Sequence, residues 1–299
     1  KIELVPLDNK GSPQESLVAL SKAIDQGIRY VTQGAGSHVA HALTDAILKH
    51  NQRNPGKEVI FLNNAAIDPP LTNEKCHFWH FRFDANVTMK VDAITTAIRK
   101  NNVINKIYLL NQDYSYGQSV AKATVRMLGE KRSDIQIVGN ELHPIMKVKD
   151  FAPYVAKIKA SGANAIYTGN WGSDLSLFVK AVGEAGLDVA LYTNYAYLVG
   201  TPRSFGPAAI NRVKVVMGWH PNIEGYPEEQ YYLDFKNKHG EDWVFMPQRL
   251  AIDMWAEAIR KAGSAEPKDV AYALEDLRYD AGVGEVWMRP DDHQAIEPL

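Results

Sequence analysis

Short polar loops follow apolar runs at five places along this chain, and most of them lead into a helical pattern. The loops cover residues 34–37, 63–66, 113–117, 169–173 and 193–197. Strand and helix therefore alternate almost throughout, which is typical of parallel sheets covered by helices on both faces. In such sheets the loops beyond the carboxyl ends of the strands gather at one edge, where ligands bind. The pattern predicts an α/β fold with a cleft for a small molecule.

The periodicity of apolar residues predicts the individual segments. We expect strands at residues 2–7, 28–32, 59–62, 79–83, 107–110, 135–139, 165–168, 189–193, 213–219 and 283–288. A first helix should begin near Pro13, because Leu17, Leu20, Ile24 and Ile28 recur at helical spacing. Further helices are expected at residues 39–49, 87–99, 118–131, 151–160, 175–185, 228–239, 247–262 and 268–277.

Length and composition exclude several classes of protein. The chain has 299 residues, of which 45% are apolar, which is enough for two domains with a sizeable core. A net charge of −2 argues against a nucleic-acid-binding surface, which needs a basic excess. Cys76 is the one cysteine, so no intrachain disulfide can form. No apolar run approaches the length of a bilayer span.

A succession of short motifs resembles the branched-chain amino-acid-type periplasmic binding proteins, the solute receptors of ABC importers. The resemblance runs in order through essentially the whole chain, over residues 2–13, Gly36-Ser37, 65–72, 112–117, 148–151, 158–163 and 284–294. No single motif is diagnostic, but their succession is fairly specific.

The resemblance implies a type I periplasmic binding fold, in which two doubly wound parallel-sheet lobes are joined by a hinge. One lobe would comprise residues 1–85 and 222–299, and the other residues 86–221. Relatives carry a strand and a helix before the position of Lys1, so the first βα unit is expected to be missing and both chain ends look clipped. Without that unit the first lobe would expose an unpaired strand edge.

The function implied is that of a non-enzymatic periplasmic receptor that traps a small carboxylate ligand between its lobes. Aromatic acids, aliphatic acids and branched-chain amino acids are the candidate ligands, in that order of preference. The receptor is expected to be an exported monomer, with a signal peptide that is not in this chain, without a cofactor, and with an ABC permease of the inner membrane as its partner. The alternative is a ligand-sensing domain of a regulator or receptor on the same fold.

In the first lobe the resemblance places the ligand carboxylate on the loop that contains Gly36 and Ser37. The helix that follows offers free N–H groups at its positive end, and Ser37 is also expected to cap that helix. The loop from Ala65 through Ala66 to Ile67 provides a second contact. Arg249 is a further candidate, although such an arginine is more often a solvated helix charge.

In the second lobe the resemblance places Tyr116, Asn170, Trp171 and Tyr195 against the ligand. Core packing is the competing explanation for the aromatic rings. Amino-acid binders have a threonine at the position of Ile67 and an acidic residue near that of Tyr195. A buried ammonium without such partners is costly, so these two departures favour a carboxylate with an apolar or aromatic body and no amine.

Other chemistries find little support. No glycine completes a dinucleotide fingerprint after Gly34 and Gly36, and Val39 occupies the last glycine position of a nucleophile elbow. His38 and His41, like His77 and His80, lack a cysteine or carboxylate at a recognisable zinc spacing. We therefore expect no bound metal and no enzymatic activity, and we interpret residues 291–293 as a structural turn.

Overall fold

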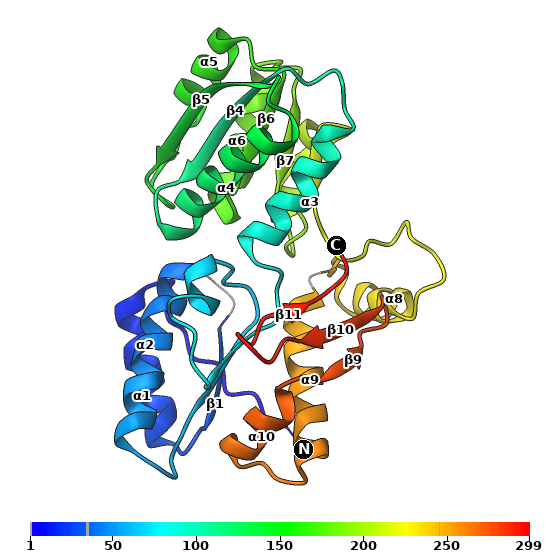
Figure 1. Cartoon of the computed structure of the whole chain (residues 1–299). Helices are drawn as coiled ribbons and strands as arrows, with labels where there is room; N and C mark the ends of the chain where they lie inside the picture. The colour runs from blue at the N-terminus through cyan, green and yellow to red at the C-terminus, as the bar shows by residue number, and fades with distance from the viewer. Residues whose placement is uncertain (1, 34–35, 245) are drawn as a thin grey trace. The chain divides into compact units, whose positions relative to one another are not determined.

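The contacts in a computed structural model, which describes residues 2–33, 36–244 and 246–299, divide the chain into two compact units (Figure 1). Unit 1 comprises Lys1–Asn86 and Met246–Pro298, and unit 2 comprises Val87–Phe245 together with Leu299. The sequence-based division assigned residues 222–245 to the first lobe, whereas their contacts group them with unit 2.

Unit 1 is built on a parallel sheet of order β1-β2-β3, formed by Tyr30–Gln33, Ile60–Asn63 and His80–Arg82. Helices α1 (Pro13–Asp25) and α2 (Ser37–Arg53) pack together against one face, where Val31 joins their apolar cluster. The opposite face meets α9 (Met246–Ala262), because the Tyr30 ring packs at a tilt against Trp255, with ring centroids 4.7 Å apart. Helix α10 (Pro267–Leu274) packs on α9, and a short 3-10 helix, η1, covers Pro69–Thr72.

The strand predicted at residues 2–7 is wrong, because this segment has no regular secondary structure. β1 lies at the end of its sheet, and within the described residues β2 is the strand that pairs with it. Leu4 in this segment remains 68% exposed. An apolar run becomes a strand only when a neighbouring backbone takes up its N–H and C=O groups, and among the described residues no strand pairs with this segment.

Strand β3 is buried on both faces, although the alternation of its residues predicted a half-buried strand. Arg82 tolerates burial because its guanidinium donates to Gln294 Oε1 at 2.6 Å and to the Asp68 carbonyl at 2.7 Å. It also donates to the Thr72 hydroxyl. The alternation of polar and apolar residues shows only which side chains are polar. A polar side chain whose hydrogen bonds are satisfied can still be buried in the protein interior.

The C-terminal part of unit 1 forms an antiparallel ribbon of order β11-β10-β9. Its strands are β9 (Arg278–Asp280), β10 (Glu285–Met288) and β11 (Ala295–Ile296). Only β10 was predicted from the sequence, because three-residue and two-residue strands are too short to show a period. A bridge between Arg82 and Gln294 joins this region to the edge of β3.

Unit 2 contains a five-stranded parallel sheet of order β5-β4-β6-β7-β8. The strands are β4 (Lys106–Gln112), β5 (Gln136–His143), β6 (Ala165–Thr168), β7 (Ala190–Thr193) and β8 (Val213–Val215). The helices are α3 (Val87–Arg99), α4 (Ser115–Lys131), α5 (Ala152–Ser161), α6 (Gly172–Glu184), α7 (Thr201–Phe205), the 3-10 helix η2 (Gly206–Ala209) and α8 (Glu228–His239). The predicted bounds of α3, β6 and α8 are confirmed, and Gly162 ends α5 in a left-handed conformation as expected.

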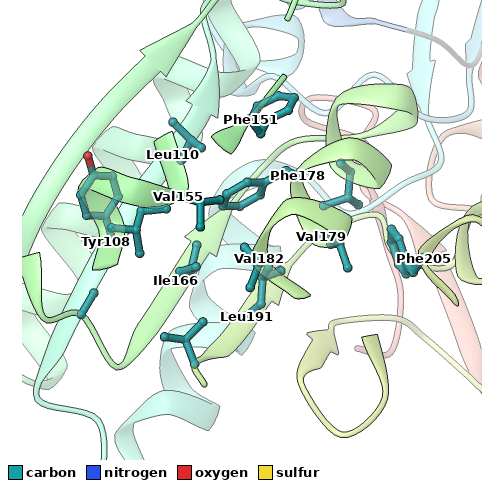
Figure 2. Close-up of a cluster of buried hydrophobic side chains, with 14 of the residues drawn as sticks. Tyr108, Leu110, Phe151, Val155, Ile166, Phe178, Val179, Val182, Leu191 and Phe205 are labelled. Carbon is teal, nitrogen blue, oxygen red and sulfur yellow. The ribbon is translucent and has the colours of Figure 1, made fainter. Parts of the chain in front are cut away.

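The core of unit 2 lies between β4, β6 and β7 on one side and α5, α6 and α7 on the other (Figure 2). Phe178 is fully buried at its centre and meets Phe151 with ring centroids 5.6 Å apart. Ile166 and Leu191 come from neighbouring strands and point into the same cluster. This packing holds the strands in register and so fixes where their carboxyl ends meet.

We expect unit 1 to lose stability as the pH falls from about 6.5 towards 4. Burial lowers the pKa of His77 from 6.5 to about 4, and its Nδ1 accepts the Trp79 N–H at 3.2 Å. Burial likewise holds the pKa of His80 well below 6.5. The unfolded chain binds these protons first, so stability is full above pH 6.5 and decreases by up to about 1.4 kcal/mol per pH unit for each histidine below it.

Urea unfolding measured between pH 4.5 and 7.5 tests this expectation. The variant His77→Gln should show a smaller slope across that range, and the remaining slope reflects His80. A matched change at an exposed histidine, His239→Gln, should leave the slope unchanged. Equal slopes in the wild type and in His77→Gln would contradict the assignment.

Candidate functional site

The loops that follow β4, β6 and β7 meet at the carboxyl edge of the unit 2 sheet. Asn194, directly after β7, contacts both α4 and β6, because its Nδ2 donates to the Tyr116 hydroxyl at 3.0 Å and its Oδ1 accepts from the Tyr167 hydroxyl at 2.9 Å. The third loop is fixed by Asn111, whose Oδ1 accepts the Gly169 N–H at 2.7 Å. Tyr116, Asn170 and Tyr195, predicted from different segments of the sequence, are thus brought to one edge.

Aromatic rings form a continuous group at this edge. Trp171 Nε1 donates to the Tyr114 hydroxyl at 2.8 Å, and the Tyr114 ring lies 5.7 Å from that of Tyr116. The Tyr195 ring follows at 6.1 Å from Tyr116, with Tyr197 a further 6.3 Å away. Tyr116 and Tyr195 are almost fully buried, whereas Trp171 is half-buried at the start of α6. Such rings can stack on a flat ligand and also present polar tips.

Several buried polar side-chain atoms at the same edge make no hydrogen bond within the part of the protein that the structure describes. Within the described residues they include Asn111 Nδ2, Ser115 Oγ, both amide atoms of Asn170, and Thr193 Oγ1. Asn170 and Thr193 are fully buried. Buried polar groups in folded proteins are nearly always satisfied, by protein, ordered water or a ligand. This edge therefore offers donors and acceptors that a bound molecule can take up.

In unit 1, the residues expected to hold a carboxylate lie at the start of α2. Gly36, with φ at +77°, is the N-cap residue and makes no side-chain cap bond, so the cap predicted for Ser37 is wrong. Ser37 is instead the first residue of the helix, and its Oγ accepts the Asp68 N–H at 3.3 Å. The preceding residues 34 and 35 lie outside the described residues. Ser37 thus ties α2 to the next loop.

That next loop is shaped by the amide of Asn63. Its Oδ1 accepts the Ala66 N–H at 2.8 Å and the Ala65 N–H at 3.3 Å, and its Nδ2 donates to the Ala66 carbonyl at 2.8 Å. Ile67 is buried, and Asp68 accepts from or pairs with His41 Nε2 at 2.7 Å. The bonds of Asn63 and Asp68 therefore place Ser37 beside the loop that contains Ala65, Ala66 and Ile67.

Arg249 lies elsewhere in unit 1, on α9. Its Nε donates to the Asp253 carboxylate one turn further along the helix, at 3.0 Å. The two residues line a cavity of about 10 Å³ together with Met246, Leu250, Tyr279 and Ala281. A cavity of that size holds about one water molecule. The role of Arg249 as a ligand contact stays a prediction.

A larger cavity, of about 450 Å³, runs along the open edge of β1. Its lining is mainly apolar and is contributed by residues 3–7, α1, β1 and α9. None of the ten predicted site residues lines it. The cavity therefore lies apart from the predicted ligand contacts.

The remaining candidates serve structural roles. His293 stacks on Phe81 at 4.0 Å and its Nε2 lies 3.1 Å from Glu275 Oε1, as expected for a packed turn residue. Cys76 is a free cysteine at an exposed position, and partial desolvation raises the pKa of its thiol. The described ranges hold no group of three metal-ligating side chains. In the same ranges, no helix combines the length and apolar character required to cross a bilayer.

Sequence reasoning did not name Lys90, Asn111, Ser115 or Thr193 as ligand contacts, although Ser115 and Thr193 lie in loops that it predicted to reach this edge. The burial of Lys90 could have been predicted, because it lies on the same face of its helix as the apolar residues Val87, Val91 and Ile94. A charged residue at a core position needs partners and so marks a special environment. The other three are short polar residues near strand ends, and nothing in their spacing separates them from ordinary loop residues.

Comparison with known proteins places the chain in a family. Its residues 1–299 match the model described as "Periplasmic binding protein". It is 32% identical to Leu/Ile/Val-binding protein homolog 4 of Brucella abortus (strain 2308) over 306 residues, covering 100% of this chain and 73% of the relative. The chain belongs to the periplasmic binding protein family, as the motifs predicted.

Solved structures agree on the fold. The crystal structure of the leucine-, isoleucine-, valine-, threonine- and alanine-binding protein from Brucella ovis, in a closed conformation, superposes with a TM-score of 0.85 at 31% identity, covering 99% of this chain and 77% of that one. A solute-binding protein of an ABC transporter from Rhodopseudomonas palustris BisB5, in complex with 3,4-dihydroxybenzoic acid, superposes with a TM-score of 0.82 at 19% identity, covering 99% and 80%. The type I periplasmic binding fold predicted from the sequence is confirmed.

Proposed function

We propose that this protein is the solute-binding receptor of an ABC importer and that its ligand is a small carboxylate with an apolar or aromatic body. The observation that carries the proposal is the set of buried, unpartnered polar atoms among aromatic rings at the carboxyl edge of unit 2. A ligand there would satisfy Asn170 and Thr193 while its body lies against Tyr116 and Tyr195. Ser37 and the loop around Ala66 are the proposed contacts from unit 1.

Two residues favour an acid over an amino acid. Ile67 is a buried aliphatic side chain and Tyr195 is a buried phenol, at positions where the resemblance expects groups that hold an ammonium. Neither supplies a negative charge, and an ammonium desolvated without one is costly. The relatives' names support both classes: one is a Leu/Ile/Val-binding protein homologue and one was crystallised with an aromatic acid.

The rest of the proposal follows from the family. A receptor of this kind works in the periplasm, as a monomer, and delivers its ligand to an ABC permease of the inner membrane. Delivery requires that ligand contacts favour one conformation over another, because a ligand shifts a population only by its differential affinity. The chemistry proposed is binding without turnover.

Calorimetric titration with leucine and with 4-methylpentanoate tests the ligand class, since the two molecules differ only in the amino group. We expect the acid to bind at least about tenfold tighter than leucine, because the transfer penalty falls only on the amine. Benzoate extends the series to aromatic bodies. Tighter binding of leucine would contradict the ligand class, and no binding of any of the three would contradict the carboxylate proposal.

The variant Asn170→Ala tests the place of the site. It removes two buried polar atoms and should weaken binding by about tenfold or more, because a hydrogen bond to a charged ligand contributes about 1.5–3 kcal/mol. Asn140→Ala is the matched control, since Asn140 is exposed on β5. Unchanged affinity in Asn170→Ala would show that the ligand binds elsewhere.

A further inference from the structure

The side chain of Asn170 is buried at the carboxyl edge of the unit 2 sheet with both ends of its amide unused. It lies just after the end of β6 and is fully buried. Within residues 2–33, 36–244 and 246–299, neither its Oδ1 nor its Nδ2 meets a hydrogen-bond partner. A buried amide in this condition costs free energy unless water or a ligand supplies the missing bonds.

The backbone around Asn170 is held firmly in place. The Asn170 N–H donates to the Thr168 hydroxyl at 3.1 Å, and the Gly169 N–H donates to Asn111 Oδ1 at 2.7 Å. A Cβ on Gly169 would lie 3.2 Å from the Tyr116 hydroxyl, so this loop passes close to the row of aromatic rings. These contacts fix the point from which the Asn170 side chain extends, beside Tyr116 and Asn111.

The unused groups at this edge differ in what they can do. Asn111 Oδ1 accepts an N–H, so its Nδ2, which meets no partner among the described residues, is a donor. The hydroxyls of Ser115 and Thr193 can donate as well. Asn170 differs from these residues, because its amide keeps one donating and one accepting end whichever way it is turned.

A carboxylate satisfies only part of this set. Its oxygens accept hydrogen bonds and donate none, so they can take up the Nδ2 groups of Asn111 and Asn170. Asn170 Oδ1 would then stay buried without a donor. An ammonium would supply donors, but it carries a charge that a neutral amide does not balance. A hydroxyl is a neutral donor and so fits the remaining atom.

We propose that the ligand is a 2-hydroxy acid and that Asn170 is the residue that selects its hydroxyl group. The two ends of an amide share one carbon, so the acceptor and the donor that they meet must lie side by side on the ligand. A 2-hydroxy acid has this arrangement, because its carboxylate oxygen can accept from Nδ2 while its hydroxyl donates to Oδ1. The inference rests on the proposed function and deepens it, since it names the substituent beside the carboxylate.

The first experiment uses the wild-type protein alone. Calorimetric titration compares 4-methylpentanoate, 4-methyl-2-oxopentanoate and each enantiomer of 2-hydroxy-4-methylpentanoate, which differ only at C2. The hydroxy acid has a donor there, the oxo acid only an acceptor, and 4-methylpentanoate neither. We expect one enantiomer to bind at least about tenfold tighter than the other two acids, because only a hydroxyl satisfies Asn170 Oδ1. Phenylacetate, phenylglyoxylate and mandelate repeat the comparison with an aromatic body.

The outcomes of this series separate the inference from the proposed function. If 4-methylpentanoate or the oxo acid binds as tightly as the better hydroxy acid, and the aromatic series agrees, the inference is overturned while the proposed function stands. Water would then be what satisfies the Asn170 amide. If none of these acids binds, the result counts against the proposed function itself.

The second experiment changes Asn170 to leucine, which has a similar size but no hydrogen-bonding atom in its side chain. In Asn170→Leu the advantage of the hydroxy acid over 4-methylpentanoate should fall at least about tenfold. Asn140→Leu, at an exposed position on β5, is the matched control and should keep the wild-type ratio. Equal weakening of both ligands in Asn170→Leu would show a merely structural role and overturn the assignment. If thermal unfolding shows that Asn170→Leu does not fold, the wild-type series decides by itself.

Discussion

Replacing Arg82 by methionine is expected to lower the free energy of unfolding of unit 1 by about 3–5 kcal/mol. The arginine is fully buried, and its guanidinium donates to Gln294, to the Asp68 carbonyl and to Thr72. Methionine fills a similar length but supplies no donor, so three buried acceptors lose their partners. Each such loss costs about 1–3 kcal/mol. Urea unfolding followed by circular dichroism measures the change.

Arg126→Met provides the matched control. Arg126 lies 53% exposed on α4 and pairs with Glu130 one turn away. Exposed pairs of this kind contribute less than about 1 kcal/mol, so its unfolding midpoint should hardly move. If Arg82→Met were as stable as Arg126→Met, the buried arginine would not be what joins β3, η1 and the C-terminal ribbon.

The variant Gly117→Ala is expected to destabilise unit 2 by about 3 kcal/mol and to weaken ligand binding as well. A Cβ on Gly117 would lie 1.9 Å from the carbonyl oxygen of Gln112. The clash is with backbone, which cannot turn aside as a side chain can, so the first turn of α4 must shift. Tyr116 and Ser115 lie in that turn and would move with it.

Gly129→Ala, in the same helix, is expected to have the opposite effect. A Cβ there meets nothing within 4 Å, so alanine should stabilise the helix by about 0.5–1 kcal/mol. Thermal unfolding and calorimetric titration of both variants, side by side, check the pair. A stable Gly117→Ala protein with wild-type affinity would contradict the tight packing of α4 against the end of β4.

Long, strongly periodic segments were predictable because their residues carry the signal locally. α3 and α8 were predicted at their observed bounds, and β6 likewise. The apolar stripe of a helix and the run of a buried strand depend on the chain alone. The loops that carry Tyr116, Asn170 and Tyr195 were expected to meet because loops after parallel strands gather at one edge of the sheet, and the family resemblance pointed to these residues within them.

Residues 2–7 were predicted as a strand and have no regular structure, because a strand also requires a partner that the local sequence does not supply. Ser37 was predicted as a cap and is the first residue of its helix, because Gly36 takes the cap position and Asp68 takes the hydroxyl. Both errors concern hydrogen bonds to residues distant in the sequence.

The order of apolar and polar residues was enough to predict the α/β class and the strand ends that carry polar loops, and the succession of motifs was enough to indicate the family. The burial of Lys90 among tyrosines, and of the side chains of Asn170 and Thr193 without hydrogen-bond partners, emerged only from the folded protein. Burying a charge or an amide costs an amount that depends on the groups around it in space. Those groups come from β4, β6, β7 and α3, which meet only when the sheet has formed.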